Sequence, residues 1–169
     1  MRIAARLANR ASSHDVTLET AGRTQSLAVA AKATGDGSAV NGGEFLMLAL
    51  ATCYCNDLYR EAAARGITLT AVEVEASAEF AAAGLAASDI RYRARVESTA
   101  PPAAIEALLR ETDQVAEVHN TVRAGRPVRR EPWPDAPNVE KATGKPPVTV
   151  GCRAAGVRQS SLHWQDDGR

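Results

Sequence analysis

Residues 41–66 read NGGEFLMLALATCYCNDLYREAAARG, and this stretch decides the fold. From Glu44 to Arg65 it contains neither glycine nor proline and is rich in helix-forming residues, which predicts a long helix. Gly66 follows as the expected C-terminal cap. Residues 45–55 are apolar on nearly every side, so they must be covered from several directions, whereas the second half of the helix is expected to meet water. We therefore expect a central helix.

Alternating apolar and polar residues on both sides of this helix predict β-strands. Before it, Asp15–Thr20 and Gln25–Ala31 alternate and are separated by a turn at residues 21–23, which indicates a β-hairpin. After it, Thr68–Phe80 and Asp89–Ser98 alternate in the same way and indicate a second pair of strands.

A second helix and an irregular extension follow these strands. Pro101-Pro102 suits a helix start, and apolar residues then recur at helical spacing to about His119. Residues 126–169 hold six of the eight prolines and show little periodicity, apart from a possible short strand at residues 148–150. We predict one domain over residues 1–125 and an irregular C-terminal extension over residues 126–169.

The bulk composition excludes several classes of protein. Twenty basic residues balance twenty acidic ones, which argues against nucleic acid as a partner. No apolar run approaches the roughly 18–20 residues of a membrane span, and Met1–Arg10 lacks the continuous apolar core of a signal peptide. Three cysteines, an odd number, suit reduced thiols better than a disulfide framework. We expect a cytoplasmic protein without a membrane partner.

The order of elements and the residues of the central helix together resemble the OsmC/Ohr superfamily of osmotically inducible and organic hydroperoxide resistance proteins. Residues 41–53, NGGEFLMLALATC, are similar to a family motif in which a cysteine follows a glutamate by nine residues. The resemblance spans residues 15–128, and residues 41–62, particularly 51–62, are similar to a distinct branch of the superfamily. It implies an α+β OsmC-like fold with an N-terminal β-hairpin, a long central helix, a second β pair and a second helix, assembled as an intertwined homodimer.

The same resemblance implies roles for individual residues. Cys53 takes the position of the peroxidatic cysteine. Residues 116–122, AEVHNTV, fall where the family has its second motif, and there Ala116 replaces the resolving cysteine. Peroxidase members also place an arginine from an N-terminal loop beside the thiolate. Arg10 and Arg23 lie in that region of the sequence, but neither aligns with the family arginine.

The two neighbouring cysteines are candidates for different roles. A reactive Cys53 needs a cation or hydrogen-bond donors to stabilise its thiolate, and the alternative is a buried, inert cysteine. Cys55 is two residues further along a helix of 3.6 residues per turn, so the side chains point roughly 200° apart and a disulfide between them is not expected. One should face a cleft and the other the core or a subunit boundary. A metal site from this pair with His119 as third ligand is disfavoured for the same reason, and Cys152 is interpreted as incidental.

Four polar residues near these cysteines have two interpretations each. Glu44 either acts near the thiol, by hydrogen bonding there or by binding an arginine, or only complements the helix dipole. His119 is either a base or donor beside a cleft or a solvated residue at a helix end. Asn56 and Asp57 either line a pocket or belong to an ordinary polar face.

We accordingly expect a thiol-dependent peroxidase that acts in oxidative stress defence. Its candidate catalytic residues are Cys53, Cys55, Glu44 and His119. Cys53 would attack a hydroperoxide to form a sulfenic acid, which an external thiol or Cys55 would recycle. No cofactor is expected, and the expected partners are a second copy of the chain and a small hydroperoxide or thiol. The alternatives are a non-catalytic protein on the OsmC scaffold that binds a small apolar ligand or thiol at the dimer interface, and a structural dimer with inert thiols.

Overall fold

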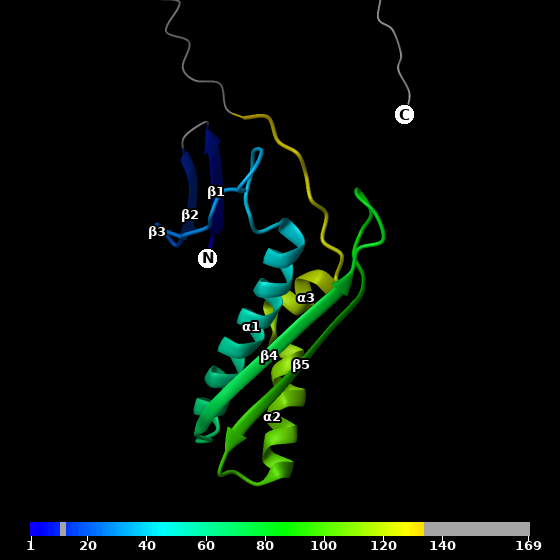
Figure 1. Ribbon diagram of the computed structural model, residues 1–169. Helices are drawn as coiled ribbons and strands as arrows, with labels where there is room; N and C mark the ends of the chain where they lie inside the picture. The colour runs from blue at the N-terminus through cyan, green and yellow to red at the C-terminus, as the bar shows by residue number, and fades with distance from the viewer. Residues whose placement is uncertain (11–12, 134–169) are drawn as a thin grey trace, which may run out of the picture. The chain divides into compact units, whose positions relative to one another are not determined.

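The computed structural model describes residues 1–10 and 13–133 and has the element order β1-β2-β3-α1-β4-β5-α2-α3 (Figure 1). The elements are β1 (Ile3–Arg10), β2 (Ser13–Thr20), β3 (Arg23–Ser26), α1 (Gly42–Ala64), β4 (Leu69–Glu79), β5 (Ser88–Ser98), α2 (Pro102–Val115) and α3 (Glu117–Arg123). Paired strands, with helices between and after them, make an α+β protein, and this part of the prediction is confirmed. The predicted strand at residues 148–150 and Cys152 lie outside the described residues.

The first three strands form an antiparallel sheet in the order β1-β2-β3. The predicted hairpin is confirmed as β2 and β3, with Ala21 and Gly22 at φ angles of 50° and 79° in the turn between them. Two positive φ angles in a two-residue loop match the right-handed twist of the flanking strands. The strand β3 ends at Ser26 rather than at Ala31, and β1 was not predicted because arginines interrupt its alternation.

The second pair of strands, β4 and β5, is antiparallel and is covered on one face by helices (Figure 1). α1 packs on β4 and α2 packs on β5, which makes a two-layer arrangement. The register pairs Val72 with Val96, and both side chains pack against the core. The residues that alternate with these apolar ones are charged. Arg93 of β5, for example, forms an ion pair of 2.6 Å with Glu75 of β4. The alternation thus gives the hairpin an apolar and a charged face.

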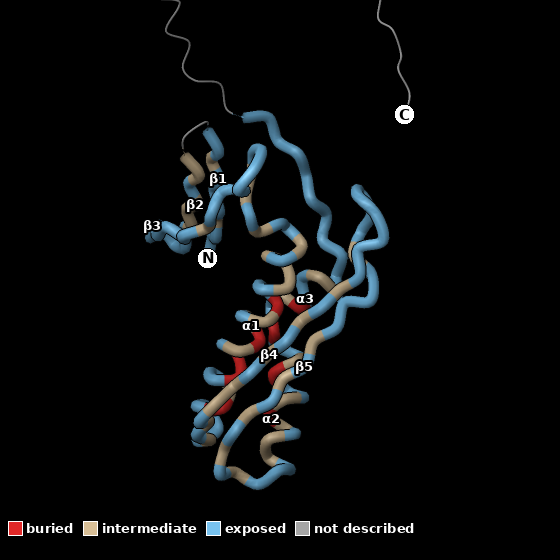
Figure 2. Tube along the Cα trace, viewed as in Figure 1, coloured by how far each residue is buried: buried red, intermediate tan, exposed pale blue. Residues whose placement is uncertain are grey.

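The core lies between the helices and this hairpin, as the buried segments in Figure 2 show. It is formed by Tyr54, Leu58, Ala62, Leu108 and Ala116. The second half of α1 faces the core with Leu58 and Ala62, while most of its other residues are exposed, as expected from the sequence. In the first half, Leu48 is 57% exposed, so the chain alone does not cover all of the apolar segment.

Both ends of α1 follow the rules of helix capping. The Asn41 side chain accepts a hydrogen bond of 3.0 Å from the Glu44 amide, and the Glu44 carboxylate accepts one of 2.7 Å from the Asn41 amide. This reciprocal pair is a capping box, and it starts the helix at Gly42. At the other end Gly66 has a φ of 66°, as expected for a residue that ends a helix in the left-handed region.

The second helix is interrupted, so the prediction of one helix to about His119 was wrong. α2 ends at Val115, Ala116 is extended with a ψ of 101°, and α3 then begins. Side chains of α3 satisfy carbonyl groups at the end of α2, because Asn120 donates to the Gln114 carbonyl at 2.9 Å. This compensation explains how the chain tolerates a break without glycine or proline.

Across the described residues, no helix combines the length and the apolar character that crossing a bilayer requires.

Candidate functional site

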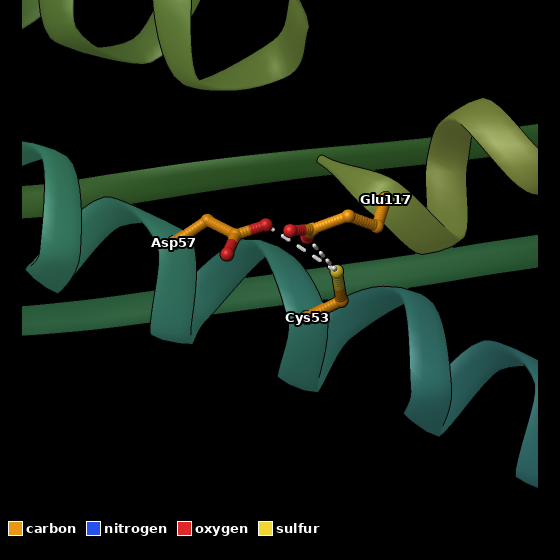
Figure 3. Close-up of side chains that lie close together, drawn as sticks. All are labelled: Cys53, Asp57 and Glu117. Carbon is orange, nitrogen blue, oxygen red and sulfur yellow. Dashed lines mark hydrogen bonds between the residues drawn. The ribbon is translucent and has the colours of Figure 1, made fainter. Parts of the chain in front are cut away.

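Cys53 lies in the middle of α1, where the start of α3 approaches it (Figure 3). Its thiol donates a hydrogen bond to Asp57 Oδ2 at 3.3 Å, one helical turn further along α1. A second carboxylate, that of Glu117 in the first turn of α3, lies 4.0 Å from the sulfur. The backbone amide of Val118 also forms a hydrogen bond with the sulfur. The partly buried thiol is therefore surrounded by two acceptors and one donor.

The cation of this site is Arg60. Its Nη1 lies 2.5 Å from Asp57 Oδ1 and 4.0 Å from Glu117 Oε1. The Asp57 side chain is only 4% exposed, and a carboxylate buried to that degree requires a partner of opposite charge. We call Cys53, Asp57, Arg60 and Glu117 the thiol cluster.

These surroundings keep the thiol protonated at rest. Burial is the largest cause that raises the pKa of Cys53 above its ordinary value, and the nearby charges of Asp57 and Glu117 raise it further. The Val118 amide lowers the pKa, but it does not offset the other contributions. The sulfur is thus a hydrogen-bond donor at neutral pH and becomes a nucleophile only when its proton leaves.

A metal ion is a further possibility for the thiol cluster. The ligand-type atoms of Cys53, Asp57 and Glu117 lie within 4.8 Å of one another. However, the Arg60 guanidinium already supplies positive charge to both carboxylates, and a metal ion would have to compete with it. We therefore interpret the cluster as a site of proton chemistry.

Cys55 lies apart from this cluster. It lines a shallow pocket with Ala51, Thr52, Asn56 and Val74. Both Cys53 and Cys55 are free thiols in the structure, and they contact different neighbours, as expected for residues two apart on a helix. The donor set of Cys53, Cys55 and His119 considered from the sequence is not brought together.

His119 belongs to an aromatic cluster rather than to the thiol cluster. Its ring centroid lies 4.5 Å from that of Tyr92 and 5.6 Å from that of Tyr54. The residue is only 4% exposed, so it is not a solvated histidine, and neither ring nitrogen has a hydrogen-bond partner among the residues that the structure describes. Glu44, the other polar candidate, forms its hydrogen bond within the capping box. Nine residues of helix, roughly 13 Å, separate Glu44 from Cys53.

Because His119 is buried, the stability of the fold should fall when the pH drops below about 6.5. Burial, with a smaller contribution from Arg123, lowers the pKa of His119 from its ordinary value of 6.5. Below pH 6.5 the unfolded chain therefore binds a proton that the folded chain does not, which favours unfolding. Above pH 6.5 both states are neutral and the full stability is present. Urea unfolding at pH 7.5 and 5.5 should show the loss.

The variant His119→Phe keeps an aromatic ring in the cluster but cannot be protonated. Its unfolding free energy should change less between these two pH values than that of the wild type. Asp113 does not interfere, because the hydrogen bond from Arg123 helps to hold its pKa below the ordinary 3.8, outside this window. Equal pH dependence in the two proteins would show that His119 is protonated equally in both states.

Three residues of the thiol cluster were not selected as catalytic from the sequence. Asp57 follows Cys53 by four residues, so the helical spacing could have singled it out, and the same holds for Arg60 at the next turn. Glu117 carries no such signal. It reaches the sulfur because the chain breaks at Ala116 and starts a new helix there.

Fold and site together define an α+β protein whose partly buried helical thiol lies against a break between two later helices. The sequence profile of the OsmC-like protein family matches residues 35–131, which is more than half of the chain. The chain therefore belongs to the OsmC-like family, and the family assignment made from residues 41–53 is confirmed.

A solved structure agrees with this fold. An OsmC like protein from Mycoplasma pneumoniae matches with a TM-score of 0.52 and 18% identity, over 72% of this chain and 86% of that chain. An organic hydroperoxide resistance protein OsmC from Legionella pneumophila matches with a TM-score of 0.49 and 19% identity, over 73% of this chain and 90% of that chain. Among curated proteins, none matches the sequence significantly.

Proposed function

We propose that this protein is a thiol-dependent peroxidase that reduces organic hydroperoxides through Cys53 in defence against oxidative stress. The observation that carries the proposal is the placement of Cys53. By the resemblance of residues 41–53 to the family motif it corresponds to the peroxidatic cysteine, and the backbone amide of Val118 forms a hydrogen bond with its sulfur. Such a donor stabilises a thiolate as it forms.

The reaction follows from the chemistry of a single thiol. The sulfur attacks one peroxide oxygen, the O–O bond breaks, and the products are a sulfenic acid on Cys53 and an alcohol. Ala116 stands where a resolving cysteine would be, so an external thiol must recycle the protein. One thiol condenses with the sulfenic acid and releases water, and a second thiol then reduces the resulting mixed disulfide.

Peroxide consumption by three proteins tests the proposal. Wild type, Cys53→Ser and Cys55→Ser are mixed with cumene hydroperoxide and dithiothreitol, and the remaining peroxide is measured. Cys53→Ser should lose at least about 100-fold in rate because it lacks the nucleophile. Cys55→Ser should keep the first turnover, since Cys55 lies apart from the thiol cluster.

Equal consumption by wild type and Cys53→Ser would contradict the assignment of the nucleophile. Failure of all three proteins to consume peroxide would favour the second candidate, a non-catalytic protein that binds a small apolar ligand or thiol on the same scaffold. One observation supports that candidate, namely that burial and two carboxylates raise the pKa of Cys53 and leave the resting thiol protonated.

We also propose that the protein acts as a homodimer in which the exposed face of α1 packs against a second copy. Leu48, Thr52 and Tyr59 lie at helical spacing along α1 and are exposed. Cys55 lies on the same side of the helix. An apolar stripe on a helix requires a cover, and a second copy would supply it.

A further inference from the structure

Cys53 and Asp57 are placed for direct proton transfer. They are four residues apart on α1, so their side chains lie on the same face of the helix. The thiol points at Asp57 Oδ2, with 3.3 Å between sulfur and oxygen (Figure 3). No further group is needed between them. The thiol proton is therefore already shared with a carboxylate before any substrate arrives.

Asp57 is the better of the two acceptors at this thiol. Glu117 Oε2 lies at 4.0 Å, which is 0.7 Å further from the sulfur than the Asp57 oxygen. The Glu117 side chain is 73% exposed, whereas that of Asp57 is 4% exposed. Water competes for an exposed carboxylate and screens its charge, so the buried and nearer group governs the proton.

Arg60 holds Asp57 in this orientation. Its guanidinium binds Oδ1 at 2.5 Å and leaves Oδ2 for the sulfur. The cation thus fixes the rotamer of the acceptor and balances its charge without contacting the thiol itself. This makes Arg60 a positioning residue.

We propose that Asp57 relays the proton of the Cys53 thiol to the leaving oxygen of the hydroperoxide, with Arg60 as the residue that positions it. This inference rests on the proposed function. As sulfur attacks the nearer peroxide oxygen, the S–H electron pair stays on sulfur and the proton passes to Asp57 Oδ2. The O–O bond breaks, its electron pair leaves with the alkoxide, and Asp57 returns the proton to that oxygen. Sulfenic acid and alcohol result, and Asp57 is again a carboxylate.

The proposal can be tested because the charge of Asp57 and its role as a relay affect the reaction rate of Cys53 in opposite directions. As a neighbouring negative charge, Asp57 disfavours the thiolate, so its removal should make the thiol more reactive toward any reagent that needs only a thiolate. As a relay, Asp57 is required by a reagent whose leaving group must be protonated. Iodoacetamide needs only a thiolate, because iodide leaves without a proton. Cumene hydroperoxide has a leaving group, an alkoxide, that must be protonated.

The experiment compares Asp57→Asn with its parent in a Cys55→Ser, Cys152→Ser background, where Cys53 is the remaining thiol. At pH 7 the variant should react several-fold faster with iodoacetamide. Its single-turnover reduction of cumene hydroperoxide should fall about 100-fold, the lower range for loss of acid–base catalysis. Arg60→Gln should lower the peroxide rate less, because the acceptor remains but is no longer fixed.

Asp113→Asn is the matched control, because it also removes a carboxylate paired with an arginine, Arg123, but lies outside the thiol cluster. Both of its rates should equal those of the parent. Circular dichroism checks that each variant folds. If Asp57→Asn does not fold, Asp57→Glu replaces it, because the longer side chain moves the acceptor and should likewise slow peroxide reduction.

If both rates rise in Asp57→Asn, or if the peroxide rate is unchanged, Asp57 acts only as a charge and the relay is wrong. The proposed function survives in that case, since the parent still consumes peroxide through Cys53. If the parent itself does not consume peroxide, the proposed function fails first, and the relay fails with it.

Discussion

Replacing Leu48 by glutamate should convert the protein from a dimer to a monomer. Leu48 is 57% exposed in the single chain, in the apolar first half of α1. If a second copy covers this side chain, a carboxylate there would be buried without a partner. We expect the dissociation constant to rise at least about 100-fold, equivalent to ~2.7 kcal/mol. Analytical ultracentrifugation over a range of concentrations measures it.

Leu85→Glu is the control for this substitution. Leu85 is 60% exposed and lies in the loop between β4 and β5, outside the α1 stripe, so the charge should remain in water and the dimer should persist. A wild type that sediments at 17.8 kDa at all concentrations would refute the dimer. If both variants dissociate equally, the interface is not specific to the α1 stripe.

The exposed face of α1 illustrates what the sequence could and could not predict. An apolar run with a glutamate in its first turn and a glycine at its end predicts the helix, because these signals are local. The same run does not say which apolar side chains meet the chain's own core. Leu58 is buried in the core cluster with Leu108 of α2, whereas Leu48 is left exposed, and this division depends on where later elements pack.

The thiol cluster was only partly predictable for a related reason. Cys53 was selected through its family motif, and Asp57 lies at a spacing that helical geometry makes meaningful. Glu117 and the Val118 amide reach the sulfur only because the chain turns at Ala116. Helical periodicity continues through that turn without glycine or proline, so no local signal marks it.

The break at Ala116 leads to the second large effect, because a cysteine introduced there should form a disulfide with Cys53. Ala116 is fully buried in the same core cluster as Tyr54, the residue after Cys53. Two residues further on, the Val118 amide contacts the Cys53 sulfur. Peroxide treatment of Ala116→Cys should therefore lower the mass by about 2 Da within one chain, as sulfenic acid and thiol condense.

The new bond should also change stability strongly. It closes a loop of roughly 60 residues, and the lost entropy of the unfolded chain corresponds to about 4 kcal/mol in favour of the oxidised form. In the reduced form the added sulfur must fit a packed site, at a cost of about 1 kcal/mol. Urea unfolding of the oxidised and the reduced variant measures the difference in unfolding free energy. The wild type under the same two conditions should show no such difference.

Ala62→Cys distinguishes true proximity from general thiol oxidation. Ala62 is buried in the same cluster, but it follows Cys53 by nine residues on α1, roughly 13 Å away, which no disulfide can span. Peroxide should leave this variant without an intrachain bond between the two residues. A disulfide in Ala62→Cys but not in Ala116→Cys would mean that the start of α3 does not lie against Cys53. The thiol cluster would then lose Glu117, while the contact between Cys53 and Asp57, which depends on α1 alone, would remain.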